Sequence, residues 1–459
     1  MEKRVCVIGG GISGLSTAVR LSDLGYEVTV LEKGRASGGN VRSERREGFL
    51  LEKGPNSMLI TPQLYELIER LGLSEEIASA RPAAKKRYIV KNGILTALPS
   101  GVWSLLSTRA ISARAKLRLL AEPFIRSRSA DNETISAFFE RRLGREIVDH
   151  AVDPFVSGVY AGNPEKLAVK EAFPTIHRLE KDHGSLFLGV LFSKKQKGSN
   201  VPKGLSRSIS FMGGMQTLTD RLADVLGDSL RTEAEAKGIA IEHGGRYVVT
   251  VKGSTDDRIR CDAVVISSPS LPAADLLEGI DSRIASKLRN IRYPPIAVVH
   301  TAFQKEDVEF DPDGFGFLVP SNEERRILGS LWTSEIFEGR APEGYHLMTT
   351  FVGGARNPEL AGESDETLVR IVLEELDSVV GLAGSPVLVS VKKWERSIPQ
   401  YDVGYGSVVD EIARFSATNK GIFFCSNFLS GISVGDCVKN SGITAEKIAE
   451  YLAPEGGSS

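Results

Sequence analysis

The chain has 459 residues, of which 41% are hydrophobic and 25% charged, and its formal net charge is −2. A chain of this length is too long for one hydrophobic core, so we expect two or three domains. The small net charge gives no electrostatic reason to expect nucleic acid as a partner. Uncharged apolar runs are all too short to span a bilayer.

Cysteine and histidine spacing argues against metal and disulfide frameworks. The four cysteines show no Cys-x-x-Cys spacing and the six histidines no His-x-x-x-His pair. The apolar run at residues 5–8 stops at three glycines, which is too short for a signal peptide. We therefore expect no metal and a cytoplasmic location, with any membrane contact made at the surface on the cytoplasmic side.

A glycine-rich turn follows the first predicted strand, a short β-branched run at residues 4–8. The turn carries Gly9, Gly11 and Gly14, the Gly-x-Gly-x-x-Gly spacing of dinucleotide-binding turns. The first glycine permits a tight turn, the second lets the backbone approach a pyrophosphate, and the third allows a helix to pack closely on the strand.

The elements after the turn complete a nucleotide-binding unit. Ile12 and Ser13 lie within the turn, and a helix predicted over residues 15–24 directs its N-terminal N–H groups toward the phosphates. A second strand, predicted over residues 26–31, ends at Glu32. A carboxylate there accepts hydrogen bonds from a ribose and repels a 2′-phosphate, so the unit predicts an ADP-binding site that disfavours NADP.

A second glycine loop indicates which dinucleotide the site binds, FAD or NAD. It contains Lys33, Arg35, Gly38, Gly39 and Arg42. The pattern resembles the second motif of the amine-oxidase-like flavoproteins, in which the arginines supply charge to the pyrophosphate. NAD enzymes do not need this loop, so the sequence predicts FAD; a basic surface turn is the alternative.

Later segments of the chain are expected to belong to the same nucleotide-binding domain. A glycine turn at residues 211–216 opens a helix over 217–226, and strands are expected over 247–251 and 261–268. In the amine-oxidase-like fold, the backbone near Ala236 holds the adenine.

The C-terminal segment predicts a further return. A strand over residues 421–426 leads through a glycine-rich stretch at 431–437 into a final helix that ends at Leu452. We expect Ser433 and Val434, at the N-terminus of this helix, to bind the flavin ring, where the helix dipole stabilises negative charge. A purely structural C-terminal helix is the alternative.

Two insertions separate these pieces. Residues 92–204 are helix-like and mix apolar with basic residues, with Trp103 as an aromatic anchor. A membrane-surface helix and a substrate-domain helix with a solvated basic face both fit this pattern. The second insertion is rich in strand patterns, at residues 296–303, 314–320, 328–333 and 346–352.

The predicted fold class is therefore α/β. A discontinuous Rossmann-like FAD-binding domain is expected to carry an inserted helical domain of membrane type and an inserted α+β substrate domain. The expected boundaries are 1–91, 205–290 and 401–459 for the FAD-binding domain, 92–204 for the helical domain, and 291–400 for the substrate domain.

The motifs together resemble the protoporphyrinogen oxidase family, flavoenzymes of late haem synthesis, over essentially the whole chain. The order and spacing of many short segments carry the resemblance. They begin at Gly54, Lys86, Gly158, Gly314, Leu328, Thr350, Trp394, Ile398 and Asp436.

The resemblance implies a set of site residues. Asn56 and Arg87 would line the mouth of the active site, with Arg87 paired to a propionate. Apolar residues would sandwich the macrocycle, and the Gly158 carbonyl would face a pyrrole N–H. The apolar residues are Leu318, Leu331 and Phe351, and the implied cofactor contacts include Gly54, Pro55, Asn56 and Trp394. Core packing for the apolar residues, and a surface position for Arg87, are the alternatives.

The sequence departs from the family pattern at two positions. Tyr405 stands where the family usually has His, and Gly435 stands where Asn is common. Both lie near the expected flavin site, so they put the details of the flavin contacts in doubt.

The implied reaction is an O₂-dependent, six-electron oxidation of protoporphyrinogen IX that produces H₂O₂. No Ser/His/Asp set or carboxylate pair stands out, so we assign no general base. Oxidation of coproporphyrinogen III is the nearest alternative. An amine oxidase or a non-catalytic binder on the same fold is less favoured, and a homodimer is left open.

Overall fold

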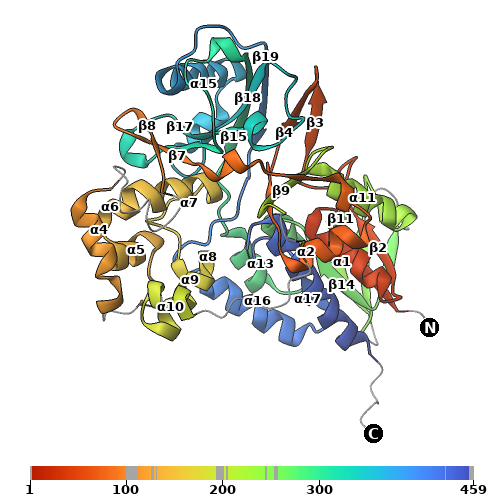
Figure 1. The fold of residues 1–459 in the computed structure, drawn as a ribbon. Coiled ribbons are helices and arrows are strands. Elements are labelled where there is room, and N and C mark those ends of the chain that lie inside the picture. Colours follow the sequence, from red (N-terminus) through yellow and green to blue (C-terminus); the bar gives the residue numbers. More distant parts are fainter. Residues whose placement is uncertain are drawn as a thin grey trace.

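The computed structural model describes residues 3–99, 111–125, 129–130, 132–192, 201–202, 205–242, 245–252, 257–429 and 431–453. It has three parts (Figure 1). A nucleotide-binding part contains the first and the last described residues, a seven-stranded sheet with its helix lies above it, and a group of helices lies beside both.

The nucleotide-binding part is built on a parallel sheet whose strands come from distant segments of the chain. Its order is β10-β2-β1-β14-β20. All neighbouring strands are parallel, with Val5 opposite both Val28 and Ala263. The bounds are Leu230–Arg231 (β10), Glu27–Leu31 (β2), Arg4–Ile8 (β1), Ala263–Ile266 (β14) and Ile422–Phe424 (β20). The predicted return of the chain to the first domain is confirmed.

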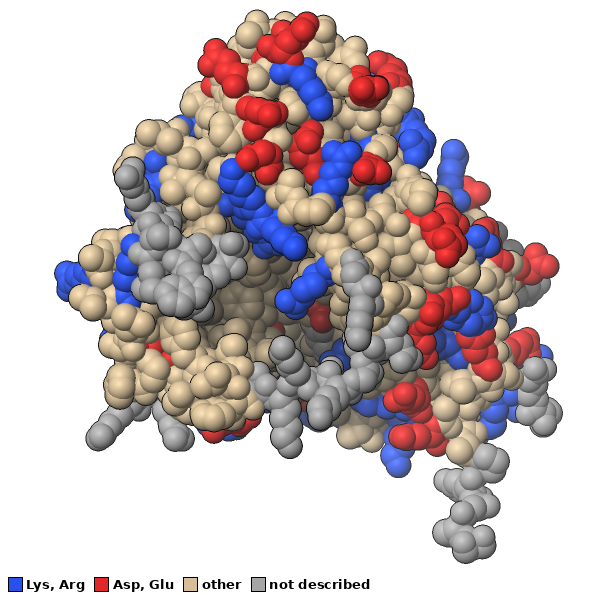
Figure 2. Space-filling view, viewed as in Figure 1, with Lys and Arg blue, Asp and Glu red and all other residues tan. Residues whose placement is uncertain are grey.

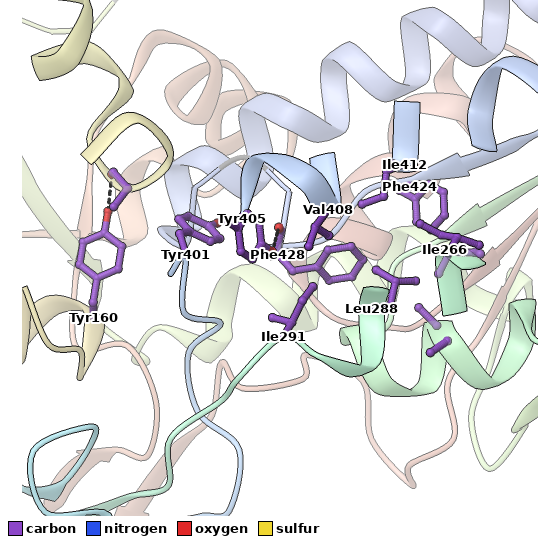
Figure 3. Packing of buried hydrophobic residues seen from close by; sticks show 14 of the residues in the cluster. Tyr160, Ile266, Leu288, Ile291, Tyr401, Tyr405, Val408, Ile412, Phe424 and Phe428 are labelled. Carbon is purple, nitrogen blue, oxygen red and sulfur yellow. Dashed lines mark hydrogen bonds between the residues drawn. The ribbon is translucent and has the colours of Figure 1, made fainter. Parts of the chain in front are cut away.

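Alternation along β1 fills one core on each face of this sheet. Val5 and Val7 enter a core with one set of helices, whereas Cys6 and Ile8 enter a second core (Figure 3). The helices on the first face are α1 (Ile12–Asp23), α2 (Pro62–Arg70), α11 (Gln216–Leu226) and α17 (Val434–Leu452). The second face is covered by α12 (Ser270–Leu277), α13 (Ser282–Arg289), α16 (Gly406–Thr418) and the sheet of β11 (Ala236–Ile241), β12 (Tyr247–Val251) and β13 (Arg258–Cys261).

A mixed seven-stranded sheet forms the second part, in the order β19-β15-β18-β17-β16-β7-β8. Its neighbours are antiparallel except β16 and β7. The bounds are Leu388–Trp394 (β19), Ile296–Gln304 (β15), Tyr345–Gly353 (β18), Ile327–Trp332 (β17), Gly316–Leu318 (β16), Tyr88–Lys91 (β7) and Ile94–Ala97 (β8). Helix α15 (Asp365–Val380) packs on one face, which leaves the other face toward the rest of the molecule.

The expected boundary at residues 91 and 92 is wrong. It falls inside the β7–β8 hairpin, and both strands of that hairpin join the seven-stranded sheet. Asn92 and Gly93 form the turn with φ of 52° and 76°. Asn-Gly with two positive φ angles is the preferred two-residue hairpin turn, so the sequence held a local signal that we missed.

The third part is helical, as expected. Its helices are α4 (Ala113–Leu120), α5 (Ile135–Leu143), α6 (Arg145–Ile147), α7 (Asp153–Tyr160), α8 (Val169–Ala172), α9 (Pro174–His183) and α10 (Leu186–Phe192). Arg142, fully buried, binds Glu180 at 2.5 Å and Glu122 at 3.4 Å and so ties these helices together. Trp103 lies outside the described residues. Among those described, no helix combines the length and apolar character needed to cross a membrane.

Short antiparallel pairings complete the nucleotide-binding part. They are β3 (Ser43–Arg46) with β4 (Phe49–Glu52), and β9 (Ser208–Phe211) with β5 (Met58–Leu59) and β6 (Ile77–Ser79). A four-residue helix, α14 (Thr333–Ile336), follows β17.

Candidate functional site

The first glycine turn is closed to side chains at Gly9 and Gly14 but open at Gly11. Gly9 has φ of 113°, and a Cβ on Gly14 would lie 2.0 Å from the Gly9 carbonyl oxygen. A Cβ on Gly11, by contrast, would meet nothing within 4 Å. Helix α1 therefore packs tightly on β1 while the backbone at Gly11 stays open to a ligand, as the sequence predicts.

The Glu32 carboxylate is fixed at the tip of β2 by backbone donors. One of its oxygens accepts from the Gly10 N–H at 2.9 Å and the other from the Gly34 N–H at 2.8 Å. The Glu32 carbonyl accepts from Ala234 N–H at 2.9 Å, which brings the segment leading to Ala236 beside it. The carboxylate and Ala236 thus lie on one side of the glycine turn.

The second glycine loop stacks directly behind the first. Gly38 N–H donates to the Gly10 carbonyl at 2.7 Å, and both Gly38 and Gly39 have positive φ. Arg42 donates to the carbonyls of Ala36 at 2.8 Å and Gly39 at 3.2 Å. Arg42 therefore braces the loop, a role that the sequence did not reveal.

The other cations of this loop lie farther out. The Arg35 side chain is 93% exposed and lies 3.4 Å from Glu233, and Lys33 is also exposed. Their contribution to pyrophosphate binding stays a prediction.

Helix α17 begins where the sequence predicts. Ser433 caps it, since its hydroxyl accepts from Asp436 N–H at 3.0 Å. Val434 packs in the same core as Val41 and Met58, and a Cβ on Gly435 would lie 3.3 Å from the Leu59 carbonyl oxygen, so the helix N-terminus lies beside β5. Its free N–H groups and dipole make this end suited to a partial negative charge.

Two tyrosines hold the loop that leads into α17 (Figure 3). The Tyr401 hydroxyl donates to the Asn427 carbonyl and accepts from Gly431 N–H. Tyr405 donates to the Phe428 carbonyl, and its ring centroid lies 4.9 Å from that of Tyr401. The departure from the family pattern at Tyr405 is thus accommodated by a buried hydrogen bond to this loop.

The segment from Glu52 to Asn56 is fastened to the seven-stranded sheet. Trp394 Nε1 donates to the Lys53 carbonyl at 2.7 Å, and His300 Nε2 lies 3.0 Å from the Glu52 carbonyl. A Cβ on Gly54 would lie 1.8 Å from the Asn40 carbonyl oxygen. Asn56 is buried, and its Oδ1 has no partner within the protein. Such an atom is costly unless a ligand or water satisfies it.

His300 was missed at the sequence level because no local motif marks it. It is fully buried, and burial, with the nearby Lys53 charge, lowers its pKa to about 4. The imidazole is therefore neutral at pH 7, and the Nε2–H tautomer donates to the Glu52 carbonyl.

The three apolar residues assigned to the substrate share one face of the seven-stranded sheet. Leu318 opposes Gly329, which in turn opposes Phe351. Leu331 lies two residues beyond Gly329 and therefore points to the same side. Alternate residues point the other way, into the core beneath α15. All three are half-buried, so this face is a partly open apolar wall.

Helix α7 meets this wall at Gly158. A Cβ on Gly158 would lie 2.5 Å from Leu318 Cδ2, so the absent side chain permits the approach. Gly158 is exposed, which leaves its backbone accessible beside the wall.

Arg87 is exposed just before β7 and lies over the Phe315 ring at 5.0 Å. Within the described chain it forms no ion pair, whereas the adjacent Lys86 is paired to Asp313 at 2.5 Å. Figure 2 shows the molecule hollowed below the seven-stranded sheet, with Lys and Arg side chains at the rim of the hollow. Arg87 is therefore free to bind an anionic group.

A family model described as flavin-containing amine oxidoreductase matches residues 12–449. The chain belongs to that family. Protoporphyrinogen oxidase 2 of Arabidopsis thaliana is 33% identical over 98% of this chain and 94% of its own length. Coproporphyrinogen III oxidase of Bacillus subtilis is 27% identical, over 98% and 99% respectively. A crystal structure from Exiguobacterium, described as a candidate protoporphyrinogen oxidase, has a TM-score of 0.81 at 25% identity, and the match covers 98% of this chain and 100% of that one.

FAD is the cofactor of this flavoprotein, and the site geometry fits it. The open backbone at Gly11 suits a pyrophosphate, the Glu32 carboxylate suits a ribose, and the unpartnered Asn56 Oδ1 suits a ring N–H. The part of the chain that the structure describes contains no group of three or more His, Cys, Asp or Glu side chains that could hold a metal ion.

Proposed function

We propose that this flavoprotein oxidises protoporphyrinogen IX to protoporphyrin IX in haem biosynthesis, with O₂ as the acceptor and H₂O₂ as the second product. One observation carries the proposal. An apolar wall wide enough to include Leu318, Leu331 and Phe351 lies beside an exposed, unpaired Arg87. A largely apolar tetrapyrrole macrocycle with acidic side chains requires that combination of surfaces.

The relatives support the same substrate class. Proteins named protoporphyrinogen oxidase reach 33% and 34% identity over nearly the full chain. Coproporphyrinogen III oxidases reach 27% and 26% over the same length. Coproporphyrinogen III is therefore the alternative substrate, and it carries more propionate groups than protoporphyrinogen IX.

The chemistry that bound FAD would supply is acceptance of hydride from a meso carbon of the substrate and transfer of the electrons to O₂. The chain orients the substrate for that transfer. We propose that the apolar wall holds one face of the macrocycle, that the Gly158 carbonyl accepts a pyrrole N–H, and that the Arg87 guanidinium binds a propionate. No side chain is needed as a general base.

The remaining residues place the cofactor. We propose that Gly9, Gly11, Ile12, Ser13 and Gly14 contact the pyrophosphate, together with the second glycine loop. The N-terminus of α17, at Ser433 and Val434, stabilises negative charge on the reduced ring. We propose that Gly54, Pro55, Asn56 and Trp394 would also contact the bound cofactor, since Trp394 Nε1 donates to the Lys53 carbonyl in the same segment.

Contact with a membrane surface is part of this proposal. Helices α4 and α10 and the turn between α4 and α5 expose large apolar side chains. They are Leu117, Leu120, Phe124, Phe187, Val190, Leu191 and Phe192, here called the apolar patch. An exposed cluster of this kind marks an interaction site.

Turnover of the two porphyrinogens tests the substrate. Aerobic oxidation is followed by porphyrin fluorescence with protoporphyrinogen IX and coproporphyrinogen III in parallel, and we expect the larger kcat/KM for the first. A larger value for the second would make coproporphyrinogen III the substrate.

The Arg87→Ala variant tests the propionate contact in the same assay. Loss of a charge-assisted hydrogen bond predicts a KM raised roughly tenfold with little change in kcat. Lys85→Ala is the matched control, because Lys85 is an exposed cation two residues away. Equal effects of the two substitutions would remove Arg87 from the site.

A further inference from the structure

Arg356 lies where helix α7 meets the end of β16, and it binds three acceptors. Its Nη1 donates to the Val319 carbonyl at 2.8 Å, and its Nη2 donates to Ser157 Oγ at 2.8 Å. The same Nη2 lies 3.3 Å from the Asp153 carboxylate, which also accepts from Ser321 N–H at 2.6 Å. The Arg356 and Asp153 side chains are only 14% and 10% exposed.

These contacts join three segments that are distant in sequence. Asp153 and Ser157 are one turn apart on α7, Val319 and Ser321 follow β16, and Arg356 follows β18. Figure 1 shows α7 beneath the seven-stranded sheet, where the helical part meets it. The Arg356 contacts therefore bridge these two parts of the molecule.

The bridged residues are the direct neighbours of two proposed substrate contacts. Ser157 precedes Gly158, and Val319 follows Leu318. The approach of these two residues is close, since a Cβ on Gly158 would lie 2.5 Å from Leu318 Cδ2. A small movement of α7 would change the space beside the wall.

Burial makes the bridge hard to open. Burial lowers the pKa of Arg356, whereas the Asp153 charge opposes that change. Separating α7 from the sheet would leave the Arg356 guanidinium and the Asp153 carboxylate buried and unpaired. An unpaired buried charge costs more stability than replacing both charged side chains.

We propose that Arg356 is a positioning residue that fixes the distance between Gly158 on α7 and Leu318 on β16, and so sets the width of the substrate site. The inference rests on the proposed function, because it assigns these two residues to porphyrinogen binding. A merely structural role for Arg356 is the competing explanation.

Three variants separate the two explanations: Arg356→Met, Asp153→Asn and the double variant. Arg356→Met leaves a buried carboxylate unpaired, so both stability and positioning are lost. The double variant removes both buried charges, so its Tm recovers toward the wild-type value. Positioning is still lost in the double variant, because methionine cannot donate to the Ser157 hydroxyl or the Val319 carbonyl.

Arg325→Met is the matched control. Arg325 is 17% exposed and paired to Glu375 at 3.0 Å, on the α15 side of the same sheet. We expect it to lower Tm without changing KM. Hydrogen exchange in the α7 peptide supplies a readout that does not depend on activity.

The expected result is a KM for protoporphyrinogen IX raised about tenfold in both Arg356→Met and the double variant, with kcat changed less than about threefold. Faster exchange in α7 accompanies it, and Arg356→Lys, which keeps the ion pair, gives a smaller rise. A double variant with wild-type KM and exchange would overturn the proposal. If Arg356→Met does not fold, Arg356→Lys and Asp153→Asn carry the same test.

Failure of the proposed function would look different. Wild-type enzyme would then oxidise neither porphyrinogen, while the Arg356 variants would still show faster exchange in α7 than the control.

Discussion

Glu32 is the residue that we propose as the ribose acceptor of the cofactor site. Its carboxylate accepts two backbone N–H groups from the two glycine loops, which fixes its position at the end of β2. We expect Glu32→Ala to weaken FAD binding by roughly 10- to 100-fold, since hydrogen bonds to a charged group contribute about 1.5–3 kcal/mol. The measurement is the Kd of FAD for the apoprotein, followed by flavin fluorescence.

Glu27→Ala is the control for that prediction. Glu27 lies on the same strand, β2, and its carboxylate is exposed and paired to Arg4 at 2.8 Å. A Glu32→Ala protein that purifies with its full flavin content would refute the assignment of Glu32.

His300 predicts a specific loss of stability in acid. Its pKa is about 4 in the folded protein and about 6.5 when exposed, so the folded state favours the neutral ring. The contribution of the neutral His300 ring to the free energy of unfolding is complete above pH 6.5. It declines as the pH falls, and it is lost once the pH is below 4. Its size is about 3 kcal/mol by proton linkage.

Urea unfolding between pH 7 and pH 4 measures this effect. We expect His300→Gln to lose less stability over that range than the wild type, and the exposed His183→Gln to behave like the wild type. An unchanged pH dependence in His300→Gln would show that His300 is not held neutral.

At the residue scale, the sequence revealed only sites carried by neighbouring residues. Gly9, Gly14 and Glu32 belong to one strand–turn–helix–strand unit, and their spacing alone predicted their geometry. Arg356 and His300 act through contacts to Ser157 and Glu52, which lie 199 and 248 positions away in the sequence. No local pattern encodes such contacts.

At the scale of elements, the hydrophobic periodicity of the sequence predicted where helices and strands lie better than it predicted the residues at which they begin and end. The strand expected over residues 247–251 matches β12, whereas α1 begins three residues before the predicted start because Gly11 serves as its N-cap. The stretch 261–268 divides into the end of β13 and the separate β14. Propensity locates a buried run, but hydrogen bonds to partner strands decide where it ends.

The apolar patch predicts binding to lipid vesicles. Phe124 and Leu191 are 84% and 74% exposed, so replacing both with Glu removes apolar contact area without disturbing the core. We expect the double variant to lose cosedimentation with anionic vesicles while keeping its solution activity. Ile241→Glu, at an exposed residue on β11, is the control. Equal sedimentation of all three proteins would leave the patch without a membrane role.

At the scale of the whole molecule, three parts enclose one hollow (Figure 2). The discontinuous FAD-binding domain was predicted from two glycine-rich returns of the chain, and the parallel sheet does combine strands from these distant segments. The width of the proposed substrate site could not be predicted from the sequence, because it depends on the contact between α7 and β16, two elements that are distant in the chain.

The measurement that tests the central claim most directly is the stoichiometry of oxidation. Purified holoenzyme is mixed with protoporphyrinogen IX in air, and porphyrin fluorescence and H₂O₂ are recorded together. We predict three molecules of H₂O₂ for each porphyrin formed, since a six-electron oxidation requires three two-electron flavin cycles. Enzyme-dependent H₂O₂ without porphyrin, or no oxidation by a protein that carries its full complement of FAD, would contradict a porphyrinogen site on this fold.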